Sequence, residues 1–120
     1  MAITPGQEPG PLTDEPLLAG MILSNEPGYY KPGAFGIRIE NLIAVRDATQ
    51  SGDEQPMLGF ENLTFAPLDR RLIDVAMLSA DERRWVDDYH ATICAKLGER
   101  LDPETQAWLY TATAPLEGAA

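Results

Sequence analysis

Apolar and polar positions along the first part of the chain predict short strands joined by turns. A brief apolar run over 21–24 ends at Asn25-Glu26-Pro27-Gly28, where the Pro-Gly pair predicts a turn. A second Pro-Gly turn, at 32–33, precedes the clearest strand, 36–45, whose side chains alternate between two faces. Residues 58–67 predict one or two further strands. Because the connections are short, we expect mainly antiparallel pairing.

The last part of the chain changes to a helical period. Ser79 followed by Glu82 is a capping box that predicts the start of a helix, and Gly98 predicts its end. Asp102-Pro103 predicts the start of a second helix, which has to end before Pro115. Strands followed by helices favour an α+β domain over a doubly wound sheet.

Three segments follow from these patterns. Residues 1–20 combine four prolines with three glycines and show neither period, so we expect an irregular arm. Residues 21–74 form the β-rich part, and residues 75–120 form a helical extension. The predicted ordered structure begins abruptly at Met21, as it would in a fragment of a larger protein.

The composition and net charge limit which partners the chain can bind and which cellular compartment suits it. A chain of 120 residues with 44% hydrophobic residues can form one globular domain without disulfides. A net charge of −10 argues against nucleic-acid binding, and no apolar run approaches the ~20 residues of a membrane helix. The single cysteine, Cys94, suits a reducing compartment, so we expect a cytoplasmic protein.

Few side chains are candidates for chemistry. The chain has no phosphate-binding loop, no nucleophile elbow and no zinc-binding pair of cysteines or histidines. Cys94 falls on the apolar side of the first helix and is interpreted as a small buried residue. His90, the single histidine, has no second ligand one helical turn away, so we expect a structural or surface role.

Two glutamates stand out. Glu26 follows a strand, and Glu40 lies inside the strand 36–45, where glutamate is uncommon and needs a compensating partner. One account is an ion pair between Arg38 and Glu40 on a solvated face. The other has Glu26 and Glu40 meeting across an antiparallel pair as ligands for Mn²⁺, Mg²⁺ or Ca²⁺, with Arg38 supporting them.

Longer motifs around these glutamates resemble a known family. Residues 20–30, read GMILSNEPGYY, and residues 36–41, read GIRIEN, resemble the last two metal-ligand segments of aminopeptidase P, the Xaa-Pro aminopeptidase of the pita-bread metallopeptidase family. The likeness continues to about residue 116 through the motifs LGFENLT, PLDRRLID and ATAP. It implies the C-terminal portion of a pita-bread fold: a small, mainly antiparallel sheet followed by two C-terminal helices.

The resemblance also implies a function. Glu26 would bind one ion of a dinuclear Mn²⁺ centre and is a candidate for moving a proton, Glu40 would bridge both ions, and Arg38 would orient the ligands. The ions activate water for hydrolysis of the bond between an N-terminal residue and proline, so the substrate would be a peptide with proline in second position. Tyr29 and Tyr30 would either line the site or simply flank the turn.

One departure from the family limits what is expected of this chain. The family site also uses two aspartates and a histidine from segments before the first glutamate, and no histidine stands upstream of Glu26. We therefore expect a C-terminal fragment of the enzyme that binds metal weakly and is inactive alone. The alternative is a non-catalytic association module that forms a homodimer or binds a partner through open strand edges and exposed apolar surface.

Overall fold

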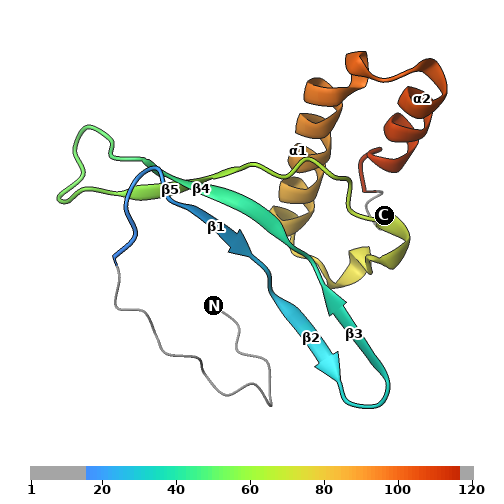
Figure 1. Cartoon of the computed structure of the whole chain (residues 1–120), viewed down its shortest axis with the longest axis horizontal. Helices are drawn as coiled ribbons and strands as arrows, with labels where there is room; N and C mark the ends of the chain where they lie inside the picture. The colour runs from blue at the N-terminus through green and yellow to red at the C-terminus, as the bar shows by residue number, and fades with distance from the viewer. Residues whose placement is uncertain (1–15, 117–120) are drawn as a thin grey trace. The chain divides into compact units, whose positions relative to one another are not determined.

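A computed structural model describes residues 16–116 of the chain (Figure 1). Most of the irregular arm expected over residues 1–20 lies outside the described residues. The chain divides into two compact units, the first ending at Thr64 and the second starting at Phe65.

The first unit contains two antiparallel sheets. The larger sheet has the order β1-β4-β5, with β1 at Ile22–Asn25, β4 at Asn41–Asp47 and β5 at Leu58–Asn62. The smaller sheet pairs β2, Gly28–Lys31, with β3, Phe35–Arg38. Val45, in the middle strand β4, is buried, as expected for an apolar strand residue with neighbours on both sides.

The two sheets keep one continuous register. Asn25 faces Asn41 at the end of the first sheet, and Gly28 faces Arg38 at the start of the second. Two residues separate the paired segments on each side, so the strands stay in step across the interruption. Figure 1 shows β1 leading into β2 in one direction and β3 leading into β4 on the way back.

This arrangement corrects two predictions. The expected strand over 36–45 is two strands, β3 and β4, and Glu40 lies in the break between them rather than inside a strand. The expected turn at Asn25–Gly28 is absent, because the chain passes from β1 to β2 without reversing. Pro27 explains the break: it lacks the N–H that the ladder needs, while its carbonyl still accepts a bond from Ile39 N at 3.4 Å.

The second unit is built from two α-helices and short 3₁₀ turns. Helix α1 spans Ala80–Leu97, and its start carries the predicted capping box between Ser79 and Glu82. Helix α2 spans Pro103–Ala112, with Asp102 accepting bonds from the first-turn N–H groups. Both helices begin where the sequence predicted, and α2 ends before Pro115 as predicted.

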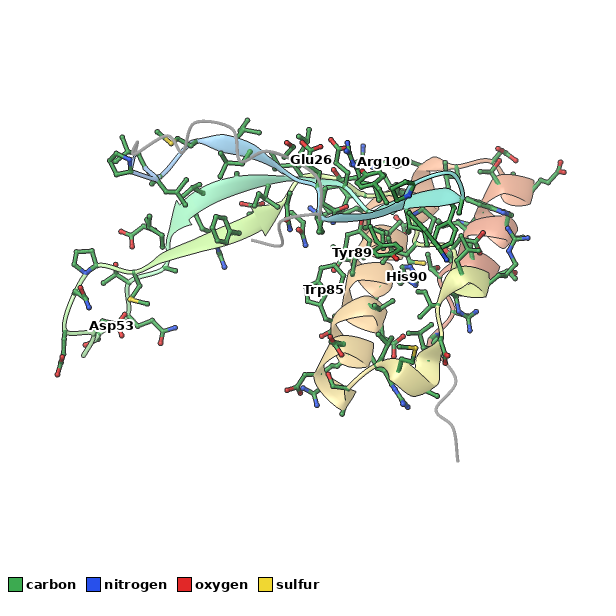
Figure 2. The ribbon with its side chains drawn as sticks, turned by 90° about the horizontal axis from the view of Figure 1, so that it is seen from below. Glu26, Asp53, Trp85, Tyr89, His90 and Arg100 are labelled. Atoms are coloured by element: carbon green, nitrogen blue, oxygen red, sulfur yellow. The ribbon has the colours of Figure 1, made fainter. Side chains whose placement is uncertain are left out.

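A small core holds the second unit together. Tyr89 and Ile93 of α1 pack with Leu109 of α2, and partly buried apolar residues surround them: Phe65, Leu68, Cys94, Leu97 and Leu101. His90 is fully buried, and its Nε2 accepts a hydrogen bond from Leu68 N at 3.0 Å. Figure 2 shows Trp85, Tyr89 and His90 along α1. His90 therefore has the structural role expected for it.

Within the described residues, no helix combines the length and apolar character required to cross a bilayer.

Candidate metal centre

Glu26 and Glu40 occupy facing positions in the interruption between the two sheets. Asn25 faces Asn41, so the next residue along each strand, Glu26 on one and Glu40 on the other, forms the next pair. Counting back from the pair Gly28 and Arg38 gives the same result. Figure 2 shows Glu26 where β1 gives way to β2. The hairpin thus brings together the two glutamates that the sequence singled out.

The hydrogen-bond pattern defines what kind of pair they form. Val45 N donates to Met21 O at 2.8 Å, and Ile39 N donates to Pro27 O, so the odd-numbered residues form the hydrogen-bonded pairs. Glu26 and Glu40 therefore form a non-hydrogen-bonded pair, the type in which side chains approach more closely. Two like charges directly opposite each other destabilise a sheet, and a positive charge nearby would reduce the repulsion between these two carboxylates.

Arg38 supplies one positive charge. Its Nη1 donates to Glu26 Oε2 at 2.9 Å, while Ser24 Oγ donates to Glu26 Oε1 at 2.6 Å. Both oxygens of Glu26 are thus held by neighbours on the same face of the hairpin. Within residues 16–116, Glu40 forms no ion pair.

Tyr30 holds Arg38 from the other side. Its hydroxyl accepts a hydrogen bond from Arg38 Nε at 2.6 Å, and the guanidinium carbon lies 5.6 Å from the centre of its ring. The hydrogen bond and electrostatic interaction with Tyr30 are the main causes that raise the pKa of Arg38 above its ordinary value; partial desolvation opposes them, and the charges of Glu26 and Glu40 add smaller contributions that raise it. Arg38 stays charged, and its guanidinium is fixed in orientation by Tyr30 and Glu26, two partners on the facing segment of the hairpin.

The geometry settles some alternatives that the sequence left open. The ion pair of Arg38 is with Glu26, not with Glu40, so the simple account of an Arg38–Glu40 pair is wrong. Tyr30 shares the face of Glu26 and contacts Arg38, whereas Tyr29 is on the opposite face and lies 6.0 Å from the Phe35 ring. Ser24 was missed by sequence reasoning, although strand alternation places it on the same face as Glu26.

The donor set fits a hard divalent cation. Two facing carboxylates provide oxygen ligands and leave negative charge that Arg38 only partly balances. Residues 16–116 contain no group of three or more His, Cys, Asp or Glu side chains that could hold a metal ion. The part of the chain described by the structure therefore offers two candidate ligands rather than a complete site.

Comparison with known proteins places these residues in a family. Residues 3–47 match metallopeptidase family M24, and residues 56–116 match the C-terminal region of peptidase_M24. The chain belongs to metallopeptidase family M24. Its two units correspond approximately to these two matches, with Glu26 and Glu40 in the first.

Sequence similarity to individual proteins is consistent with this family. The chain is 49% identical over 104 residues to "Aminopeptidase P2" of Arabidopsis thaliana, covering 84% of this chain and 15% of the relative. It is 45% identical over 108 residues to "Probable Xaa-Pro aminopeptidase P" of Aspergillus niger, covering 87% of this chain and 18% of the relative. The chain therefore spans less than a fifth of the length of these relatives.

A solved structure gives the same fold. The X-prolyl aminopeptidase of Caenorhabditis elegans, described as "a cytosolic enzyme with a di-nuclear active site", matches with a TM-score of 0.76 and 33% identity. The match covers 83% of this chain and 17% of that chain. The predicted fold class is confirmed: an α+β arrangement, the C-terminal portion of a pita-bread fold, with antiparallel sheets followed by two helices.

Proposed function

We propose that this chain supplies Glu26 and Glu40 as ligands to the dinuclear Mn²⁺ centre of an Xaa-Pro aminopeptidase. The observation that carries the proposal is the facing pair of carboxylates, with Arg38 bound to one of them at 2.9 Å. The family membership and the dinuclear site described for the C. elegans relative support it. The remaining ligands come from parts of the enzyme other than residues 16–116.

Each side chain has a defined task in this proposal. Glu40 would hold both ions, and Glu26 would hold one of them and exchange a proton with the reacting groups. Ser24 and Arg38 fix the two oxygens of Glu26, so the carboxylate does not have to be ordered when substrate binds. The ions, when bound, would acidify water and polarise the carbonyl of the peptide bond before proline.

The substrate in this proposal is a peptide with proline in second position, as the names of the relatives indicate for those proteins. We also place the enzyme in the cytosol, in line with the description of the C. elegans relative. The isolated chain is catalytically silent in this account, because two carboxylates hold a divalent ion weakly.

Activity of the complete enzyme tests the ligand assignment. We expect Glu40→Gln to reduce cleavage of an Xaa-Pro peptide by at least about 100-fold, since an amide removes the charge that holds both ions. Glu61→Gln is the matched control, because Glu61 is an exposed strand glutamate of β5 that faces Ala44. Full activity of Glu40→Gln together with full activity of the control would refute the bridging role.

One observation favours the second candidate function, an association module. The hairpin face opposite Glu26 exposes Tyr29, Phe35 and Ile37, each more than half accessible to solvent. Such a surface is commonly covered by another chain. Under this alternative the isolated chain forms a homodimer at micromolar concentration in sedimentation experiments, and a monomer would contradict it.

A further inference from the structure

Two glycines lie beneath the ring that orients Arg38. Gly36 directly faces Tyr30 across the hairpin, and Gly28 precedes Tyr30 by two residues on the same face. Neither glycine has a positive φ, so their backbone conformations are open to other residues. The reason for glycine at these two positions has to be sought in the space above them.

That space is filled by the Tyr30 side chain. A Cβ added at Gly36 would lie 2.7 Å from Tyr30 Cδ1, and one added at Gly28 would lie 2.8 Å from both Tyr30 Cε2 and the Tyr30 hydroxyl. Non-bonded carbon atoms prefer a separation of about 3.5–4.0 Å, so either Cβ would push the ring away from the sheet. The Tyr30 ring lies flat on the backbone of Gly28 and Gly36. Any other residue type at these positions would place a side chain where the ring lies.

Displacing the ring would break a chain of contacts. The Tyr30 hydroxyl accepts the bond from Arg38 Nε at 2.6 Å, and Arg38 Nη1 donates to Glu26. The position of the phenol therefore fixes the tilt of the guanidinium, which in turn fixes one oxygen of Glu26.

We propose that Gly28 and Gly36 are positioning residues, whose bare backbones let the Tyr30 ring lie flat and thereby orient Arg38 toward Glu26. The consequence for catalysis rests on the proposed function, but the orientation of Arg38 does not. In the complete enzyme, loss of this support should lower kcat with little change in KM, because the glycines and Tyr30 act through Arg38. The expected loss is about 10- to 100-fold, as for other outer partners of metal ligands.

The direct test is the NMR signal of the Arg38 Nε–H group in the 120-residue chain without metal. This hydrogen bond should give the proton a distinct, slowly exchanging resonance that disappears in Gly36→Ala and in Gly28→Ala. Gly33→Ala is the control: Gly33 has φ +70° with nothing within 4 Å of an added Cβ, so the substitution strains the turn without touching Tyr30. An unchanged Arg38 signal in both strand variants would overturn the inference.

A double substitution guards against loss of folding. Removing the ring with Tyr30→Ala should make Gly36→Ala harmless, so the unfolding midpoint of the double variant should equal or exceed that of Tyr30→Ala alone. If Gly36→Ala still lowered the midpoint without the ring, the steric argument would be wrong. Failure of the peptidase proposal would instead appear as full activity of Glu40→Gln, with the Arg38 signal unaffected.

Discussion

Arg38 and Glu26 are twelve residues apart in sequence, and their side chains meet at 2.9 Å across the interrupted hairpin. The contact joins the two motifs that resemble metal-ligand segments and places them on one face. It is about half exposed, with side-chain accessibilities of 46% and 42%, so as a surface ion pair it adds little to stability. Its value in this account is to orient Glu26.

Arg38→Lys should show whether the orientation of the Arg38 side chain matters in addition to its positive charge. Lysine keeps the positive charge but cannot bind Tyr30 and Glu26 through a planar fork, so we expect kcat of the complete enzyme to fall by about 10- to 100-fold. The free energy of unfolding should change little, because an exposed ion pair adds little to stability. The measurements are steady-state kinetics on an Xaa-Pro peptide and urea unfolding.

Arg84→Lys provides a control for that substitution. Arg84 pairs with Asp81 at 2.8 Å on the exposed surface of α1, in the second unit of the chain. Its replacement should leave kcat unchanged. Equal losses in the two variants, or no loss in either, would contradict an orienting role for Arg38.

The 120-residue chain alone should not cleave Xaa-Pro peptides. Two carboxylates bind a divalent ion weakly and leave most of the coordination to water, so the ions are not held where hydrolysis needs them. The assay compares peptide cleavage with and without millimolar Mn²⁺. Metal-dependent turnover by the isolated chain, abolished by Glu40→Gln, would show that further ligands are unnecessary.

Acidification should destabilise the helical unit through His90. Burial, then the positive charge of Arg70, lowers the pKa of His90 below its ordinary value, while Asp87 acts in the opposite direction. The unfolded chain therefore binds a proton at His90 more readily than the folded chain does. The stability that neutral His90 contributes is complete above about pH 6.5 and is lost as the pH falls below that value. Protonation at Nε2 leaves Leu68 N without its acceptor, a loss of about 1–3 kcal/mol.

The measurement is urea unfolding followed by tryptophan fluorescence between pH 7.5 and pH 5. His90→Gln keeps an acceptor for Leu68 N but cannot titrate, so its unfolding midpoint should be flat over this range. His90 is the single histidine of the chain, and carboxylates titrate mostly at lower pH. A pH-dependent loss of the same size in His90→Gln would assign the effect elsewhere.

Ser79→Ala should destabilise the helical unit by about 1 kcal/mol. Ser79 Oγ accepts the N–H of Glu82 at 3.3 Å, and Glu82 Oε2 accepts the N–H of Ser79 at 2.8 Å. Ser79→Asp retains an oxygen acceptor and should recover most of the stability, measured by thermal unfolding. If Ser79→Asp were as unstable as Ser79→Ala, the cap would not be the cause.

The helices were predictable because their signals are local. The capping box at Ser79 and Glu82 and the Asp102-Pro103 start each lie within one helical turn, and the structure confirms both. Gly98 follows the last residue of α1 as predicted, but with φ −52° it continues into a 3₁₀ turn instead of adopting the left-handed conformation. A Cβ added at Gly98 would lie 3.1 Å from the Tyr110 hydroxyl oxygen, so any larger residue has to displace that side chain slightly.

The strands were harder to predict because their boundaries depend on the partner strand. Alternation through 36–45 is uninterrupted in sequence, and only Pro27 on the facing strand breaks the ladder beside Glu40. The ion pair of Arg38 with Glu26 depends on the same register, which spacing along a single strand does not reveal. The two glutamates were recognisable from their motifs, and strand alternation could have indicated Ser24, whereas the bond of Tyr30 to Arg38 required the paired hairpin.

Paramagnetic broadening of NMR signals by Mn²⁺ is the most direct test of whether Glu26 and Glu40 bind metal at one shared site. In a titration of the 120-residue chain, the account predicts that amide signals beside both glutamates broaden first and in parallel, and that either Glu26→Gln or Glu40→Gln abolishes the broadening at both positions. Broadening that begins at the exposed acidic loop around Asp53 and Glu54, or that persists beside one glutamate after the other is replaced, would contradict a shared site.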